Sequence, residues 1–152
     1  MRAILSIAII LAVSTMNARA QSLEQQAICA KQAKIAFEEN KADNELQLKI
    51  GQISGDYRSH YNPKLNKCLV LIERTVETGG GEFSTSSQLM DVFERRIFGT
   101  YSWTSKDTNY QEVPPAGCVL TPTSWGIILC SSKEAFDAFV SKYMEDDESE
   151  AK

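Results

Sequence analysis

The sequence predicts an α+β domain, in which an antiparallel β-meander of about four strands is flanked by N- and C-terminal helices and stabilised by disulfides. Two observations support this fold class. Apolar residues recur at helical spacing near both ends of the folded part, and short apolar or alternating segments separated by turn residues lie between them. Consecutive strands joined by short turns favour an antiparallel meander, and we expect both helices to cover one face of it.

The first twenty residues have the order of a secretory signal peptide. Arg2 supplies a positive start, residues 4–13 form an apolar run, and Ala18-Arg19-Ala20 is a small-x-small cleavage site. Since about 20 apolar residues are needed to span a bilayer, this run is too short for a transmembrane anchor. A lipoprotein would need a cysteine directly after the run, but Cys29 comes later. We therefore expect cleavage before Gln21 and a periplasmic or secreted protein with no transmembrane anchor.

We expect a single domain over residues 21–145 and a disordered acidic tail over residues 146–152. Removal of residues 1–20 leaves 14 of the 16 basic residues against 20 acidic ones, so the net charge becomes −6. Much of this excess lies in the stretch Glu145-Asp146-Asp147-Glu148-Ser149-Glu150. An acidic protein with no Lys/Arg cluster repels phosphate backbones, which argues against nucleic-acid binding.

All four cysteines lie in the expected mature part, where an even number favours disulfides over metal ligation. Four cysteines allow three pairings. We prefer Cys29–Cys68 and Cys118–Cys130, because each joins nearest partners in sequence and the second would close a hairpin at its base. Zinc sites usually contain Cys-x₂₋₄-Cys pairs, and no two cysteines here are that close. We expect no metal and no cofactor.

The first helix is expected over residues 22–40, with a continuation or a restart through Leu46 and Ile50 until Gly51. Strands are expected over residues 67–76 and 97–104. Residues 85–92 fit either a helix or a strand, and the neighbouring strands favour a strand. The apolar positions of the first helix are Leu23, Ala27, Ala30, Ala33 and Phe37.

The last expected elements are a hairpin and a helix. The hairpin pairs Val119-Leu120 with residues 126–130. Ser131 and Glu134 form a capping box that starts the final helix, which ends near Glu145. The apolar face of this helix consists of Ala135, Phe136, Phe139, Val140 and Tyr143.

His60 is the only histidine, so multi-histidine metal sites are excluded and any Ser/His/Asp or Cys/His arrangement must use it. There is no Gly-x-Ser-x-Gly motif, and Gly79-Gly80-Gly81 lacks the Lys-Ser/Thr of a phosphate loop. A glycosidase needs two carboxyl groups across a cleft, and the sequence places no pair in that way. We assign no catalytic residue.

Aromatic side chains are the remaining candidates for a binding surface. Tyr101 and Trp103 occupy alternating strand positions and are expected in the core. Trp125 lies at the tip of the expected hairpin, where an apolar ring suits a contact with a partner. His60 and Tyr61 lie in a polar and aromatic stretch that also suits a binding patch. The candidate binding residues are therefore Trp125, His60 and Tyr61.

The stretch from Ser59 to Cys68, followed near the end by Phe136-Asp137-Ala138-Phe139-Val140, resembles small exported proteins of Gram-negative bacteria that have no assigned activity. The resemblance covers most of the expected mature chain and implies a periplasmic location. It transfers no catalytic or binding residue.

The leading functional hypothesis is a non-enzymatic periplasmic or secreted module that binds another envelope protein. One alternative is an envelope hydrolase that depends on His60 together with an unidentified nucleophile or carboxylate. Another is a structural envelope protein whose helices mediate self-association.

Overall fold

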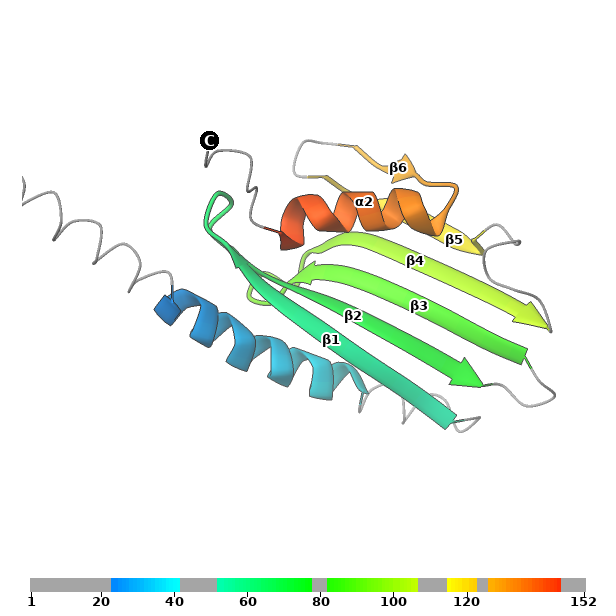
Figure 1. Cartoon of the computed structure of the whole chain (residues 1–152), viewed down its shortest axis with the longest axis horizontal. Coiled ribbons are helices and arrows are strands. Elements are labelled where there is room, and N and C mark those ends of the chain that lie inside the picture. The colour runs from blue at the N-terminus through cyan, green and yellow to red at the C-terminus, as the bar shows by residue number, and fades with distance from the viewer. Residues whose placement is uncertain (1–22, 42–51, 78–81, 107–114, 123–125, 146–152) are drawn as a thin grey trace, which may run out of the picture.

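The computed structural model describes residues 23–41, 52–77, 82–106, 115–122 and 126–145. In these ranges the chain forms a six-stranded antiparallel sheet in the order β1-β2-β3-β4-β5-β6, together with two helices (Figure 1). The α+β class is confirmed, but the sheet has six strands rather than about four. The elements are an N-terminal helix over residues 23–41, β1 (Gln52–Asn62), β2 (Lys67–Glu77), β3 (Glu82–Asp91), β4 (Ile97–Lys106), β5 (Gly117–Leu120), β6 (Ile128–Leu129) and α2 (Lys133–Met144).

The central strands agree with the sequence-based expectations. β2 and β4 each extend the expected strand by one or two residues, and β3 resolves the ambiguous segment as a strand. The expected hairpin is present as β5 and β6, in which Val119 lies opposite Leu129. The Cys118–Cys130 disulfide lies next to this pair, with Cα atoms 5.1 Å apart.

β1 is the strand that the sequence-based reading missed. It pairs with β2 over its whole length, from Gln52 opposite Glu77 to Asn62 opposite Lys67. Its residues alternate between the two faces of the sheet, as strand geometry requires. Tyr57 and Tyr61 pack against the buried cluster beneath the N-terminal helix. The even-numbered, mostly polar residues of β1 therefore face α2.

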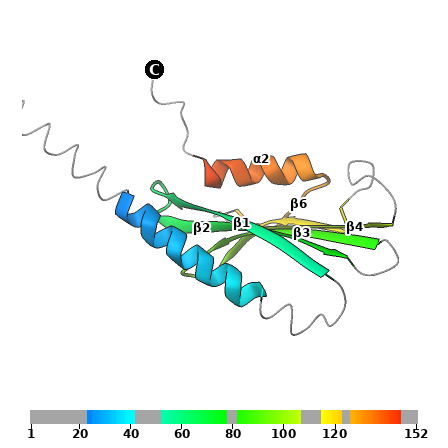
Figure 2. The same cartoon turned by 60° about the horizontal axis from the view of Figure 1, so that its bottom comes forward.

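The two helices lie on opposite faces of the sheet (Figure 2). The expectation that both cover one face is therefore wrong. β2 gives the reason, because every position from Cys68 to Ile72 is buried. Leu69 and Leu71 belong to the cluster beneath α2. Cys68, Val70 and Ile72 belong to the cluster beneath the N-terminal helix. A strand buried on both faces appears in the sequence as a continuous apolar run.

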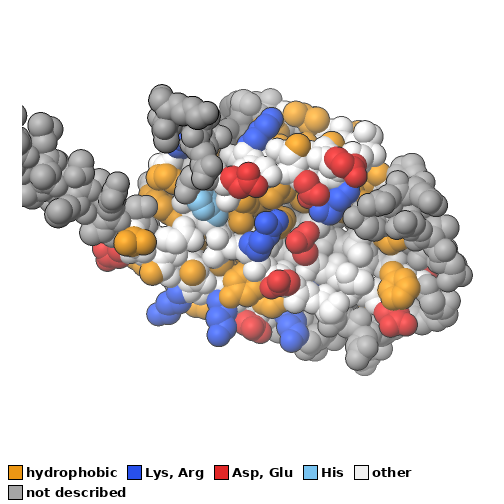
Figure 3. Space-filling view, viewed as in Figure 1, with side chains coloured by type: hydrophobic (Ala, Val, Ile, Leu, Met, Phe, Trp, Pro, Cys, Tyr) orange, Lys and Arg blue, Asp and Glu red, His pale blue; other side chains and the backbone are white. Residues whose placement is uncertain are grey.

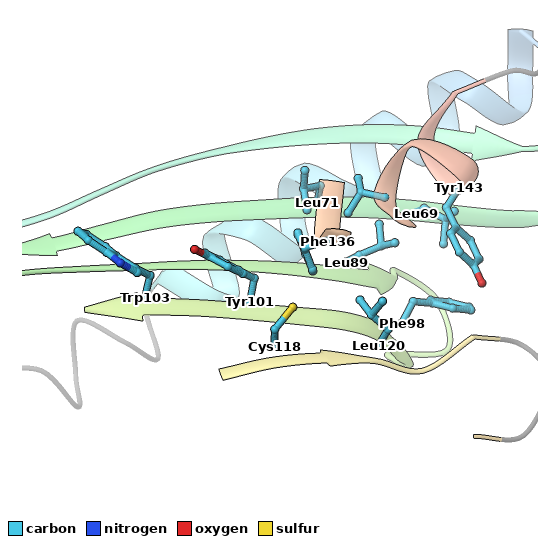
Figure 4. Close-up of a cluster of buried hydrophobic side chains, with 11 residues drawn as sticks. Leu69, Leu71, Leu89, Phe98, Tyr101, Trp103, Cys118, Leu120, Phe136 and Tyr143 are labelled. Carbon is cyan, nitrogen blue, oxygen red and sulfur yellow. The ribbon is translucent and has the colours of Figure 1, made fainter. Parts of the chain in front are cut away.

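The larger buried cluster joins the sheet to α2. Phe136 and Tyr143 come from the helix, and Figure 4 shows them with the side chains of the strands below. Tyr101 and Trp103 are 3% and 5% exposed, so their assignment to the core is confirmed. The rings of Tyr101 and Phe136 lie 5.8 Å apart, a separation typical of favourable aromatic pairs.

The N-terminal helix has the expected extent but is rotated from the expected orientation. Its buried residues are Cys29, Ala33 and Ala36, with Phe37 partly buried, whereas Leu23 is 73% exposed. The Cys29–Cys68 disulfide, with Cα atoms 5.2 Å apart, fixes this rotation by pinning Cys29 to β2. Both disulfides therefore follow the preferred pairing.

The start of α2 also differs from the expectation by one residue. The N-cap is Ser132 rather than Ser131, and its hydroxyl accepts a hydrogen bond from the N–H of Ala135 at 3.2 Å. The helix buries Phe136, Val140 and Tyr143 as expected, but Ala135 is exposed.

Several sequence-based predictions lie outside the described residues. They concern the signal peptide of residues 1–20, the helix extension through residues 42–51, Trp125 at the hairpin tip and the acidic tail of residues 146–152.

Candidate functional site

Two adjoining cavities lie on the α2 face of the sheet, beside β1. Their volumes are about 480 and 420 Å³, and Glu73 and Lys133 line both of them. The larger cavity is bordered by the first residues of β1 and by β2, β3 and β4, whereas the smaller one runs along α2 as far as Glu145. We call the pair the β1–α2 groove, which is defined by Asp56, Arg58, Glu73, Lys133, Asp137 and Ser141.

Two contacts hold α2 beside this groove. At the C-terminal end of the helix, the side-chain amide of buried Asn62 donates to the carbonyl oxygen of Tyr143 at 3.0 Å. The amide oxygen of Asn62 accepts from the N–H of Leu65 at 3.0 Å, which fixes the side chain in the β1–β2 turn. At the other end of α2, the Lys133 ammonium lies 3.8 Å from the Glu73 carboxylate. Because both contacts reach to β1 or β2, they fix the distance between helix and strand.

The groove carries an excess of negative charge near Lys133. The Lys133 ammonium lies 2.5 Å from the Asp137 carboxylate and forms the longer contact with Glu73. Asp56 lies directly opposite Glu73 on the neighbouring strand, where two like charges repel each other. Arg58 lies on the same face, so the groove has two cations against the three carboxylates of Asp56, Glu73 and Asp137. Figure 3 shows this face, on which acidic and basic side chains lie close together.

The basic residues near the groove differ in their orientation. Arg58 is exposed and, by strand alternation, faces the same side as Asp56. Arg74 follows Glu73 on β2, so its side chain belongs to the opposite face, and burial lowers the pKa of its guanidinium. The ammonium of Lys133, the first residue of α2, lies within 6 Å of the ring centres of Tyr101 and Phe136.

The sequence-based candidates do not come together in one patch. His60 is half-buried on β1 opposite Leu69, on the α2 side of the sheet. Tyr61 faces the N-terminal helix, its hydroxyl donating to Asn66 Oδ1 at 2.8 Å. Trp125 lies outside the described residues.

The described ranges contain no group of three or more His, Cys, Asp or Glu side chains with the geometry to hold a metal ion. No helix in the same ranges is long and apolar enough to span a bilayer.

A second exposed surface lies on the opposite face of the sheet, over β5 and β6. Leu129 and Ile127 are 78% and 73% exposed. Ile128 lies opposite Leu120, whose side chain packs beneath α2, so Ile128 faces the α2 side. Because side chains alternate along a strand, Ile127 and Leu129 face away from α2. We call Ile127, Leu129 and the adjacent Val119 the β6 patch.

Comparison with known proteins adds no candidate site, because no family model, curated protein or solved structure matches the chain. The β1–α2 groove therefore rests on its own geometry. Asp56 and Arg58 belong to the polar stretch around His60 that the sequence analysis considered as a binding patch. Sequence reasoning missed the rest of the groove, although Lys133 and Asp137 have the i, i+4 spacing of a helical ion pair.

Proposed function

We propose that this protein is an exported, non-enzymatic binding module, and that the β1–α2 groove holds a segment of another envelope protein. One observation carries the proposal: two adjoining cavities of about 480 and 420 Å³ lie beside β1, which is an edge strand of the sheet. Volumes of this size are typical of binding sites. The carboxylates of the groove outnumber its cations, and this charge excess would help to select a partner. No cofactor or metal is part of the proposal.

Two features support export. Disulfides persist in oxidising compartments, and the structure contains Cys29–Cys68 and Cys118–Cys130. Residues 1–20 have the charge, apolar run and small-residue site of a cleavable signal peptide. The resemblance to small exported proteins of Gram-negative bacteria favours the periplasm among the oxidising compartments.

The test is affinity capture by the tagged protein from the exported fraction of cells, with two arginine variants. Ser141→Arg fills the groove from α2, whereas Thr104→Arg adds the same side chain to exposed strand surface on the other face. We expect the wild type and Thr104→Arg to capture the same saturable partner, and Ser141→Arg to lose it. The purified protein should begin at Gln21.

Equal capture by all three proteins would contradict binding in the groove. An intact N-terminus at Met1 on the purified protein would contradict processing and export.

A second candidate function, self-association, is favoured by the β6 patch. Uncharged aliphatic side chains on an edge strand suit contact between two copies of an acidic chain, because no like charges meet there. In the capture experiment, this function predicts that the main species recovered is an untagged copy of the same chain. The tagged wild type and the tagged Ser141→Arg variant should recover equal amounts of it.

A further inference from the structure

In the part of the chain that the structure describes, no further strand pairs with the outer edge of β1. In an antiparallel pair, the N–H groups of alternate residues point away from the partner strand. The N–H of Tyr61 donates to Gln26 Oε1 at 2.8 Å and that of Tyr57 donates to Asp56 Oδ1 at 2.7 Å, so the odd-numbered residues of β1 point outward. Gly55 and Ser59 share this orientation.

The two capped N–H groups define the accessible length of this edge. Gln26 comes from the N-terminal helix and closes the end next to the β1–β2 turn. Asp56 is exposed, and its carboxylate accepts from the N–H of the next residue along the chain, so an incoming strand can replace it at the Tyr57 N–H. Among the described residues, the open stretch therefore covers residues 54–59, which is enough for a short added strand.

A strand added at this edge would lie beside the β1–α2 groove. Side chains alternate across a strand, so every second side chain of the added segment would point to the α2 side of the sheet. The wall there is the flank of α2 from Asp137 through Ser141 to Met144. Known modes of peptide recognition combine backbone pairing at a sheet edge with pockets for alternate side chains in the same way.

The charges of the groove specify the side chains that fit. Asp56 and Glu73 face each other across the strand pair, and the single ammonium of Lys133 is already paired with Asp137. At the far end, Glu145 lies at the C-terminus of α2, where the helix dipole is negative. On the α2 face, the cations of Arg58 and Lys133 are outnumbered by four carboxylates, those of Asp56, Glu73, Asp137 and Glu145. This excess of negative charge favours a cationic side chain entering from the β1 side.

We propose that the ligand of the groove is an extended segment that adds to β1 as a further strand and places Lys or Arg side chains at alternate positions toward α2. This inference rests on the proposed function and states how the groove recognises its partner. An amphipathic helix lacks the free backbone groups that the β1 edge pairs with, and an acidic segment would be repelled by Asp56 and Asp137.

The test begins with a random library of linear 12-residue peptides displayed on phage, selected on the mature, disulfide-bonded chain. Enriched peptides are then synthesised and titrated. We expect Lys or Arg at alternate positions and a depletion of proline, aspartate and glutamate. N-methylation of alternate backbone amides should weaken binding by at least about fivefold, because each methyl group removes a hydrogen bond and blocks pairing.

Protein variants locate the contacts. Asp56→Asn and Asp137→Asn should each weaken the basic peptides about two- to fivefold, as expected for partly exposed ion pairs. Glu94→Gln is the matched control, since this exposed carboxylate lies in the β3–β4 turn, and it should leave affinity unchanged. Ser59→Pro removes one outward N–H at an edge position where proline is tolerated, and the N-methylated peptides give the same information if this variant fails to fold.

The outcomes separate the two proposals. Peptides that are displaced by Ser141→Arg but are acidic, helical or insensitive to N-methylation would overturn strand addition and leave the groove as the binding site. Peptides that bind equally well to Ser141→Arg, or no enrichment at all, would overturn both. Basic, methylation-sensitive peptides that lose affinity in Ser141→Arg would support both.

Discussion

Gly99 lies on β4 beneath two phenylalanines of α2. A Cβ atom built at this position would lie 3.2 Å from Phe136 and 3.4 Å from Phe139. The register of β3 and β4 shifts here, because Leu89 pairs with Gly99 and the next residue of β3 pairs with Ile97. Phe98 is the extra residue of this bulge, and its fully buried ring joins the cluster beneath α2. The bulge and the missing side chain together let the helix approach the sheet.

Gly99→Ala should lower the free energy of unfolding by about 1 to 3 kcal/mol, because the new methyl group overpacks the contact with α2. Gly126→Ala is the control, since a Cβ at Gly126 meets nothing within 4 Å and the change should stay within about 0.5 kcal/mol. Urea unfolding followed by circular dichroism measures both. Equal effects at the two glycines would contradict this account of the α2 packing.

The N-terminal helix depends on a disulfide for its place on the sheet. It buries small residues, Ala33 and Ala36, and its aromatic contact is the stacking of Phe37 on Tyr57, with ring centres 4.8 Å apart. Because most of the stability of a helix in a protein comes from tertiary packing, its place depends on these contacts and on Cys29–Cys68.

Replacing Cys29 and Cys68 by serine should lower the free energy of unfolding by about 4 kcal/mol, because the bond closes a loop of 39 residues. Replacing Cys118 and Cys130 should lower it by about 3 kcal/mol, since that loop is shorter at 12 residues. Guanidinium unfolding of the two double variants and the wild type gives both values. A larger loss from the shorter loop would contradict the chain-entropy explanation.

At the level of elements, local pattern predicted β2, β3, β4, the β5–β6 hairpin and both helices. It missed β1 because the first helix was expected to extend as far as Gly51, and no strand was expected before residue 67. The signal was present, since Tyr57, Ser59 and Tyr61 alternate with charged or polar residues. The rotation of the N-terminal helix also followed from the preferred Cys29–Cys68 pairing, which requires Cys29 on the buried face.

At the scale of the whole molecule, the groove arises from contacts between distant parts of the chain. Asn62 and Tyr143 are 81 residues apart, yet their hydrogen bond holds the end of α2 over the first strand. Asp56 and Glu73 come together only when β1 pairs with β2. The periodicity of apolar residues within one segment does not show which distant segments pair. Without β1 in the predicted sheet, neither of these contacts could be predicted. Sequence reasoning therefore reached only the β1 side of the candidate site, through the polar stretch around His60, and otherwise selected single residues such as Trp125.

The two helices on opposite faces leave the sheet with different free surfaces. α2 and the β1 edge enclose a charged groove, whereas the β6 patch presents aliphatic side chains on the other face. A partner with a basic, extended segment would thus bind at the β1–α2 groove, whereas a second copy of the chain would bind at the β6 patch. The position of the bound molecule on the sheet therefore distinguishes the two functions.

The most direct test of the groove as a binding site is amide hydrogen exchange of the mature domain, with and without the peptides selected on it. Binding at the β1–α2 groove predicts slower exchange at Gly55 and Ser59, whose N–H groups point outward from β1, and unchanged exchange at Leu129 on β6. Slower exchange at Leu129 with no change along β1 would contradict the groove and identify the β6 patch as the binding surface.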